Sequence, residues 1–329
     1  MDRPAERLLA QGRGGLTAVT GLVSVVMPVL NGAEWLAEAT ESILAQTHRD
    51  LELIVVDDGS DDSSRDIAAA AAERDPRVRT LFLERNPLGT SSARAANAGI
   101  ALARGRYIAR MDCDDIALPD RLSRQIEFLE AEGLDGCGGR AQAFGADEGV
   151  FRYSDTPAGM ERELVFRVCL LHPTLLTRAE LMHAFPYLES ASHEDYEWLT
   201  RVAAGGGRLG NLPEIVLRRR THAEQANVRH RELFMRDLRR YRFLHVMRLF
   251  PRTRPAEFQA LAALAERTLR GPEELEAAAA WLVRLADIPD SGLRHLLLVR
   301  WREACDGLAV PAGDPFRERI ARQVAGGEG

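Results

Sequence analysis

Four short apolar runs in the first third of the chain alternate with amphipathic segments. The runs cover residues 23–29, 51–56, 78–83 and 107–111. The first of them, VSVVMPV, is a β-branched run typical of a strand buried on both faces of a sheet, and the second is also predicted to be buried. Between them, apolar positions have helical spacing over about 31–43, 61–73 and 91–103. Asn31 and Glu34 have the spacing of a capping box at the first of these helices. Three such crossovers predict an α/β fold with a doubly wound, mostly parallel sheet.

The second half of the chain is less regular and ends in a helical region. We expect helices over 121–132, 162–169 and 192–202, and strands over 140–144 and 212–217. From about residue 228, apolar positions recur every three or four residues, as in Phe258, Leu261 and Leu264. The pattern therefore predicts a loose tail over residues 1–20, an α/β domain over 21–227 and a C-terminal helical subdomain over 228–329.

The composition is typical of a soluble globular protein and narrows the kinds of partner. The 329 residues are 46% hydrophobic and 28% charged, and the net charge of -6 gives no reason to expect a nucleic-acid partner. No run reaches the roughly 20 apolar residues that a membrane span needs. The 4 cysteines form no CxxC pair, which favours free thiols in a reducing compartment, so we expect a cytoplasmic location.

Carboxylates follow two of the predicted strands. Asp57 and Asp58 come at the end of the second strand, and Asp112, Asp114 and Asp115 come after the fourth. Two carboxylates about 4 Å apart repel each other by roughly 4 kcal/mol at an effective dielectric near 20. Either water dilutes that charge, or a cation and a polar ligand neutralise it. Because ligands of doubly wound sheets bind at the carboxyl ends of the strands, the position favours a binding site.

Several stretches together resemble family-two-type inverting glycosyltransferases with the GT-A fold. The likeness begins with VSVVMPVLNGAEWLAEATESILAQTHRDLELIVVDDGSDD and extends over roughly residues 22–227. The stretches that carry it are residues 23–62, 86–99, 107–121, 193–198 and 218–222. The resemblance implies a nucleotide-diphosphate sugar as donor, with a UDP-sugar expected, and an acceptor hydroxyl. It also implies inversion at the anomeric carbon and a divalent cation, either Mn²⁺ or Mg²⁺.

The resemblance assigns three residues to nucleotide-sugar binding. Asp58 matches an aspartate that hydrogen-bonds the nucleotide base, although Asp before Gly is also typical of a turn, a role that Asp57 could take instead. Arg94 matches an arginine near the nucleotide, and Asp112 matches a carboxylate that reaches the ribose or the sugar. Leu30 departs from the pattern, because the family often has a tyrosine there that stacks on the base. The identity of the base therefore stays open.

The resemblance also assigns metal ligands and a general base. Asp114 matches the metal-binding aspartate of a DxD motif, and His222 matches a histidine that can complete the metal or diphosphate site. A lone histidine is also often structural. Asp195 matches the base that takes the proton of the acceptor hydroxyl, and Glu194 would orient the acceptor. Because Ser192 and Asp195 also have capping-box spacing, a structural role for Asp195 stays open.

Four other classes of protein compete with this prediction. A sugar-1-phosphate nucleotidyltransferase would normally carry a glycine-rich loop with basic residues including lysine, but all 43 basic residues are arginine. An NAD-dependent enzyme would need GxGxxG after the first strand, where residues 27–31 read MPVLN. A processive polysaccharide synthase would show membrane helices and a QxxRW signature, and this sequence has neither. A catalytically inactive nucleotide-sugar-binding scaffold is disfavoured by the intact set of acids but stays open.

The C-terminal region carries the least specific signal. Residues 228–250 are arginine-rich on an otherwise apolar helix, which is typical of a solvated face packed on the catalytic domain. The same segment would suit peripheral contact with an anionic membrane surface, where lipid-linked acceptors lie. The acceptor therefore stays open among a glycan, a lipid-linked molecule and a protein, in polysaccharide or glycoconjugate biosynthesis.

Overall fold

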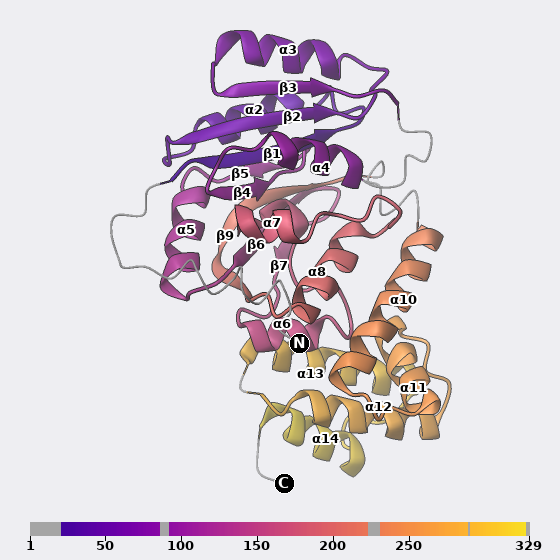
Figure 1. Ribbon diagram of the computed structural model, residues 1–329. Helices are drawn as coiled ribbons and strands as arrows, with labels where there is room; N and C mark the ends of the chain where they lie inside the picture. The colour runs from indigo at the N-terminus through magenta and orange to yellow at the C-terminus, as the bar shows by residue number, and fades with distance from the viewer. Residues whose placement is uncertain (1–20, 86–91, 223–230, 289, 327–329) are drawn as a thin grey trace. The chain divides into compact units, whose positions relative to one another are not determined.

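The protein consists of two compact units. The computed structural model describes residues 21–85, 92–222, 231–288 and 290–326 (Figure 1). The first unit is made of Met1–Arg152 and Leu170–Asp237, and the second of Tyr153–Cys169 and Leu238–Gly329.

This division differs from the predicted domains at two places. Residues 153–169, which were expected in the α/β domain, belong to the helical unit because Val165 and Phe166 join its apolar core. The second boundary follows Asp237 instead of residue 227. Asp237 belongs to the first unit because its Oδ2 accepts hydrogen bonds from the backbone N–H and the hydroxyl of Ser192, at 2.8 and 2.7 Å.

One mixed sheet forms the centre of the first unit. Its strands are β1 (Val23–Val29), β2 (Leu51–Asp57), β3 (Val78–Phe82), β4 (Tyr107–Arg110), β5 (Ile116–Ala117), β6 (Gly136–Gly145), β7 (Gly149–Phe151), β8 (Leu176–Arg178) and β9 (Leu209–Thr221). Their order is β3-β2-β1-β4-β8-β6-β9-β5, with β7 paired to β6. The pairs β3–β2, β2–β1 and β1–β4 are parallel, as predicted. The later half is mixed, because β8 runs antiparallel to β4 and β6 while β9 runs parallel to β6.

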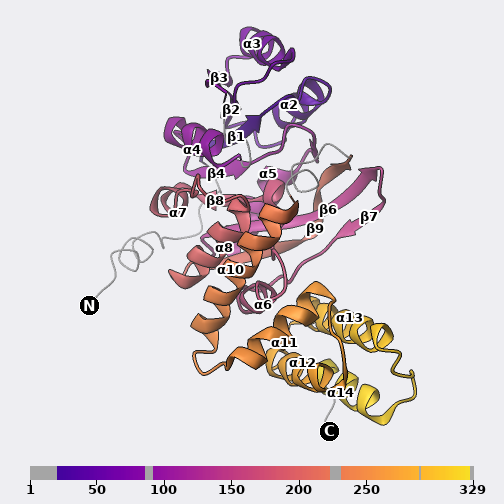
Figure 2. The same cartoon turned by 90° about the vertical axis from the view of Figure 1, so that its right-hand side faces the viewer.

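Helices cover both faces of this sheet. They are α2 (Leu36–Leu44), α3 (Ser64–Arg74), α4 (Ala93–Leu102), α5 (Arg121–Ala131), α7 (Ala179–Ala184) and α8 (Glu194–Ala204), with a 3₁₀ turn η1 at His172–Thr174. Helix α4 lies on one side of the first strands and α2 on the other (Figure 2). Helix α4 approaches the sheet closely because it carries Gly99, where a Cβ would lie 2.5 Å from Cγ1 of Val26. Helix α4 thus packs on β1 and β2, and Arg94 in its first turn reaches Asp58, the residue that follows β2.

The predicted capping box at the first helix is wrong. Helix α2 begins at Leu36, and its N-cap residue, Trp35, makes no side-chain capping bond. Asn31 instead adopts a left-handed backbone with φ of 55° and joins two loops. Its backbone N–H donates to Ser60 Oγ (2.9 Å), and its side-chain oxygen accepts from the N–H of Asp61 (3.0 Å). The loops that follow β1 and β2 are therefore tied together beside the strand ends.

The irregular segment after α5 contains more structure than the sequence predicted. The expected short strand over 140–144 is the second half of β6, a ten-residue strand. The helix expected over 162–169 is wrong in position, because α6 spans Pro157–Glu163. Thr156 caps it by accepting from the N–H of Gly159 at 3.1 Å, and proline occupies its first turn.

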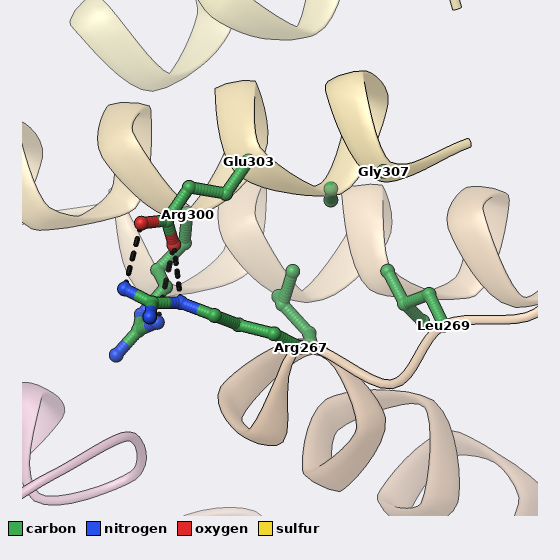
Figure 3. A pocket seen from close by; sticks show the side chains of 7 residues that line it. Arg267, Leu269, Arg300, Glu303 and Gly307 are labelled. Carbon is green, nitrogen blue, oxygen red and sulfur yellow. Dashed lines mark hydrogen bonds and ion pairs between the residues drawn. The ribbon is translucent and has the colours of Figure 1, made fainter. Parts of the chain in front are cut away.

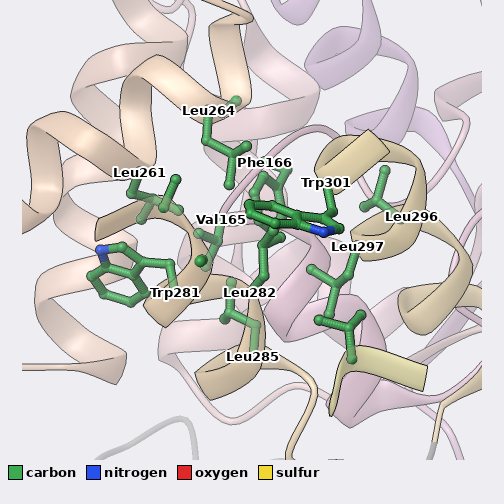
Figure 4. Packing of buried hydrophobic residues seen from close by; sticks show 14 of the residues in the cluster. Val165, Phe166, Leu261, Leu264, Trp281, Leu282, Leu285, Leu296, Leu297 and Trp301 are labelled. Atoms are coloured by element: carbon green, nitrogen blue, oxygen red, sulfur yellow. The ribbon is translucent and has the colours of Figure 1, made fainter. Parts of the chain in front are cut away.

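The second unit is a small helical bundle with its own core. Besides α6 it contains α11 (Pro255–Glu266), α12 (Pro272–Leu285), α13 (Ser291–Gly307) and α14 (Pro315–Ala325), and α10 (Arg231–Leu249) contains the boundary between the units. Figure 4 shows Trp281, Leu282 and Trp301 packed with apolar side chains from neighbouring helices. Within the described residues, no helix is both long enough and apolar enough to cross a membrane.

Candidate active site

The parallel half of the sheet brings the predicted acids to one edge. Strand β1 lies between β2 and β4, with Val29 opposite Asp57 and Val26 opposite Arg110. All three strands run in the same direction, so their carboxyl ends meet at the same edge of the sheet. Asp58 follows β2, and the acids Asp112 to Asp115 follow β4. The sequence prediction that these acids share an edge is confirmed.

Asp57 takes the turn role that would otherwise compete for Asp58. Oδ1 of Asp57 accepts from the backbone N–H groups of Gly59 and Ser60, each at 3.1 Å, and from Nε of Arg65 at 2.7 Å. Gly59 has a φ of 87° and no room for a Cβ, which would lie 2.2 Å from Cα of Arg85. The tight turn is therefore built without the side chain of Asp58.

Asp58 and Arg94, both expected near the nucleotide, are hydrogen-bonded to each other. Nε of Arg94 donates to Oδ1 of Asp58 at 3.0 Å, and Nη2 donates to the same oxygen. Asp58 is only 5% exposed. Burial raises the pKa of its carboxyl group, although the Arg94 guanidinium opposes this shift. The pair presents a hydrogen-bond acceptor and a donor side by side. Residues 86–91, the first part of the resembling stretch 86–99, lie outside the described residues.

Asp112, Asp114 and Asp115 form a compact acid cluster. One ligand atom from each lies within 4.8 Å of the others. Burial would raise the pKa of Asp112, but the adjacent Arg110 guanidinium outweighs this and lowers it. Burial and the negative charge of Asp112 raise the pKa of Asp114, and they raise that of Asp115 well above its usual range. The three carboxyl groups are thus electrostatically unequal.

His222 is brought against Asp114 from the far end of β9. Its Nε2 lies 3.0 Å from Oδ2 of Asp114, and its ring packs on Trp35 with 4.3 Å between ring centroids. The two residues are 108 positions apart in the chain. Contact between these two predicted metal ligands is therefore a result of the sheet topology.

Asp115 is fixed to the same strand by the backbone. Its Oδ1 accepts from the N–H of Arg220 at 2.8 Å, whereas its buried Oδ2 has no hydrogen-bond partner in the described part of the chain. The side chain of Arg220 lies against the ring of Phe144, as does that of Arg218. These two arginines therefore have packing roles on β9, in addition to any role toward a phosphate group.

The donor atoms of this cluster fit a divalent cation. Clustered carboxylate oxygens are the ligands that Mn²⁺ and Mg²⁺ prefer, and an imidazole nitrogen lies beside them. The buried oxygen of Asp115 without a partner and the mutual repulsion of the acids are both features that a cation would relieve. The residues present therefore fit the metal that the sequence predicted.

The capping-box interpretation of Asp195 is wrong. Helix α8 has His193 as its N-cap residue, without a side-chain capping bond. The hydroxyl of Ser192 donates to Asp237 instead of capping the helix. Oδ1 of Asp195 accepts from the N–H of the next residue, Tyr196, at 2.7 Å and lies 3.3 Å from Nε2 of His193. The capping box is therefore absent, although Asp195 lies in the first turn of α8, where an acid interacts favourably with the helix N-terminus.

His172 is a buried imidazole that feels the charges of both Asp195 and Asp112. Its Nε2 lies 2.7 Å from the hydroxyl of Tyr187. Burial and the positive charge of Arg110 lower the pKa of His172 to about 4, while the charges of Asp195 and Asp112 act in the opposite direction. The imidazole is therefore neutral at physiological pH and lies within the electrostatic reach of both acids.

Three polar residues beside the acids were not found from the sequence as a connected group. Arg110 donates to Asp112 and, through Nη2, to the hydroxyl of Ser92 at 3.0 Å. That hydroxyl donates to Oε1 of Glu194 at 2.8 Å. The one available signal was a charged residue in the otherwise apolar strand 107–111.

The second unit contains a separate small cavity of about 40 Å³. Within it, Arg267 donates to both carboxylate oxygens of Glu303, at 3.0 and 2.7 Å, and Arg300 donates to one of them at 3.2 Å (Figure 3). A cavity of this size has room for little more than water. Its lining contains none of the predicted site residues; it consists of Leu264, Arg267, Leu269, Arg300, Glu303, Ala304 and Gly307.

The sheet and the acid cluster define a nucleotide-sugar transferase-like domain of the GT-A type. Residues 24–186 match the model of glycosyl transferase family 2. The chain belongs to that family. The succinoglycan biosynthesis protein ExoO of Rhizobium meliloti is 48% identical over 111 residues, which are 34% of this chain and 30% of ExoO. The chain spans less than half the length of the curated relatives that it matches at 36–48% identity.

Two solved structures share the fold over nearly the whole chain. TarS 1-349 of S. aureus, in complex with UDP-GlcNAc, has a TM-score of 0.58 and 17% identity, covering 93% of this chain and 92% of TarS 1-349. The mannosyltransferase PcManGT of Pyrobaculum calidifontis, in complex with GDP-Man and Mn²⁺, has a TM-score of 0.57 and 19% identity, covering 98% and 89%. The predicted fold class is confirmed by both.

Proposed function

We propose that this protein is a metal-dependent inverting glycosyltransferase that transfers a sugar from a UDP-sugar to an acceptor hydroxyl. The observation that carries the proposal is the arrangement of Asp114 and His222 in one contact, with Asp112 beside them, at the carboxyl edge of the sheet. Family membership and the nucleotide sugars bound by TarS and PcManGT support the same class of reaction.

Asp58 and Arg94 would bind the nucleotide base. The carboxylate can accept from a ring N–H, and the guanidinium beside it can donate to a neighbouring carbonyl oxygen. Uracil and guanine present such an edge, whereas adenine and cytosine do not. Leu30 is 43% exposed at the end of β1, so it offers apolar contact without the stacking of an aromatic ring. We assign uracil as the base and treat guanine as the alternative to be tested.

Asp112, Asp114 and His222 would hold the charged part of the donor. Asp112 is assigned to the ribose or the sugar, and Asp114 with His222 to the divalent cation, either Mn²⁺ or Mg²⁺. The bound cation would supply neutralisation of the negative charge on the departing diphosphate. Asp115, which is tied to the backbone of β9, would hold the loop in place.

Asp195 would act as the general base. Its carboxylate takes the proton of the acceptor hydroxyl as the oxygen attacks the anomeric carbon from the side opposite the leaving group. The new bond to the acceptor forms while the bond to the diphosphate breaks, so the anomeric configuration inverts. Glu194 would orient the acceptor. His172, which is neutral because its pKa is lowered to about 4, would shape the site beside Asp195.

The acceptor and the cellular location are assigned from a relative's name and from the surface of α10. The likeness to a succinoglycan biosynthesis protein favours a polysaccharide or glycoconjugate acceptor. On α10, Phe243 and Leu244 are 46% and 55% exposed next to the exposed Arg240, a combination suited to an anionic membrane surface. We therefore propose a cytoplasmic enzyme with peripheral membrane contact through this helix.

A thermal-shift panel tests the proposed function. UDP-glucose, UDP-N-acetylglucosamine, GDP-mannose and UTP are each added with and without MnCl₂. A matching UDP-sugar at a hundred times its Kd should raise the melting temperature by about 5 °C, and only with the metal present. Stabilisation by UTP alone would favour a nucleotidyltransferase. Stabilisation by none of these compounds would contradict the proposal, and binding without turnover would favour the inactive scaffold.

A further inference from the structure

A buried arginine at the end of β4 lies between two groups of acids. Arg110 is the last residue of the strand and is only 6% exposed. One guanidinium nitrogen, Nη1, donates to Asp112, and the other, Nη2, donates to the hydroxyl of Ser92 at 3.0 Å. Burying a charge is costly unless it is paired and hydrogen-bonded. Both terminal nitrogens of the buried guanidinium group therefore need hydrogen-bond partners.

The second partner continues the chain of hydrogen bonds. The hydroxyl of Ser92, at the start of α4, accepts from Arg110 and donates to Oε1 of Glu194 at 2.8 Å. The backbone N–H of Ser92 approaches the same oxygen at 3.3 Å. Glu194 is the first residue of α8 and directly precedes Asp195. A continuous path thus runs from Asp112 through Arg110 and Ser92 to Glu194.

This path connects three separate elements of the first unit. Asp112 follows β4, Ser92 precedes α4, and Glu194 begins α8. Ser92 makes no side-chain capping bond on α4, so its hydroxyl is committed to the path instead of to the helix. A planar guanidinium fork can hold two acceptors at a fixed separation, which a lysine ammonium cannot do.

We propose that Arg110 is a positioning residue. Acting through Ser92, it holds the donor-binding carboxylate of Asp112 and the acids Glu194 and Asp195 at the start of α8 at a fixed position relative to each other. This inference rests on the proposed function, because Asp112 is assigned to the donor and Glu194 to the acceptor. Arg110 is assigned to neither substrate, and its guanidinium donates to Asp112 and Ser92. A disturbance at the Ser92–Glu194 end is therefore transmitted to donor binding at Asp112.

Donor affinity in a double-mutant cycle tests the linkage. Ser92→Ala removes only the middle of the path, and Arg110→Lys keeps the charge but cannot bridge both partners. Affinity for UDP-N-acetylglucosamine, UDP-glucose and GDP-mannose is measured by calorimetry with MnCl₂, using the compound that binds the wild-type protein most tightly. Each single variant should lose about tenfold in affinity, and the double variant should lose no more than either single variant.

The controls separate positioning from simple loss of stability. Ser92→Thr keeps the hydroxyl and should keep the wild-type affinity, and Ser123→Ala removes a serine hydroxyl on α5 that is outside the path. Should Arg110→Lys fail to fold, the contrast between Ser92→Ala and Ser92→Thr still decides the matter. Wild-type affinity in Ser92→Ala, or single losses that multiply to about a hundredfold, would overturn the proposal.

A failure of the proposed function can be recognised separately. If the wild-type protein binds none of the probes, the proposed function is contradicted. The coupling between Arg110 and Ser92 is then measured by urea unfolding of the wild type, Ser92→Ala, Arg110→Lys and the double variant. Non-additive losses of stability would support the path from Arg110 to Glu194, whereas additive losses would overturn it.

Discussion

Replacing Asp195 with asparagine should abolish sugar transfer and leave donor binding nearly unchanged. Asparagine has the shape of aspartate but cannot accept the acceptor's proton, so we expect the turnover rate to fall by about a thousandfold. The hydrogen bond that the N–H of Tyr196 donates to Oδ1 of Asp195 would be preserved, because the amide oxygen of asparagine can accept it. Donor affinity by calorimetry and release of nucleoside diphosphate, measured on the same preparation, separate the two effects.

A matched control distinguishes the base from a helix-end charge. Asp66 is an exposed aspartate in the first turn of α3, just as Asp195 lies in the first turn of α8. Asp66→Asn removes the same favourable interaction with a helix N-terminus but should leave turnover unchanged. A loss of donor binding in Asp195→Asn, together with lowered stability, would show that Asp195 supports the fold instead of the chemistry.

Replacing Asp114 with alanine should remove the metal dependence of donor binding. The carboxylate is assigned to the cation, and His222, left without its 3.0 Å partner, cannot replace it. We expect at least about a hundredfold weaker binding of the nucleotide sugar in the presence of MnCl₂. Calorimetric titrations of the donor, with MnCl₂ and with EDTA, measure this loss directly.

The control for this variant is a neighbouring aspartate outside the cluster. Asp120 is exposed and makes no side-chain capping bond at the start of α5, so Asp120→Ala should behave as the wild-type protein does. In EDTA, all three proteins should bind the donor equally weakly. Equal donor affinity of the wild type and Asp114→Ala with MnCl₂ present would contradict the metal assignment.

The first half of the sheet was predictable because its signals are local. Each strand from β1 to β4 is a short, mostly apolar run, and each crossover contains a helix with its own periodic pattern. Strand β6 was largely missed because it begins with glycines, which have low strand propensity. Gly139 is required by close packing, since a Cβ there would lie 2.5 Å from Cγ2 of Val216 on β9. Only the fold makes that requirement visible.

The candidate site likewise contains residues with local sequence signals and residues that only the fold brings together. Asp58, Asp114 and Asp195 could be chosen by the family resemblance, because the short motifs that carry it are local in the sequence. The path through Arg110 could not be chosen, because its hydrogen bonds join residues 18 and 102 positions apart. The capping role of Ser192 was wrong for a related reason, because its hydroxyl has a distant partner on α10, Asp237.

The most direct test of the central claim is the configuration of the sugar released from a UDP-α-sugar. In the absence of an acceptor, water can take its place, and proton NMR with MgCl₂ follows the first anomer formed before mutarotation. An inverting transferase with Asp195 as base should release the β-anomer together with UDP, and Asp195→Asn should release neither. First appearance of the α-anomer would contradict the account.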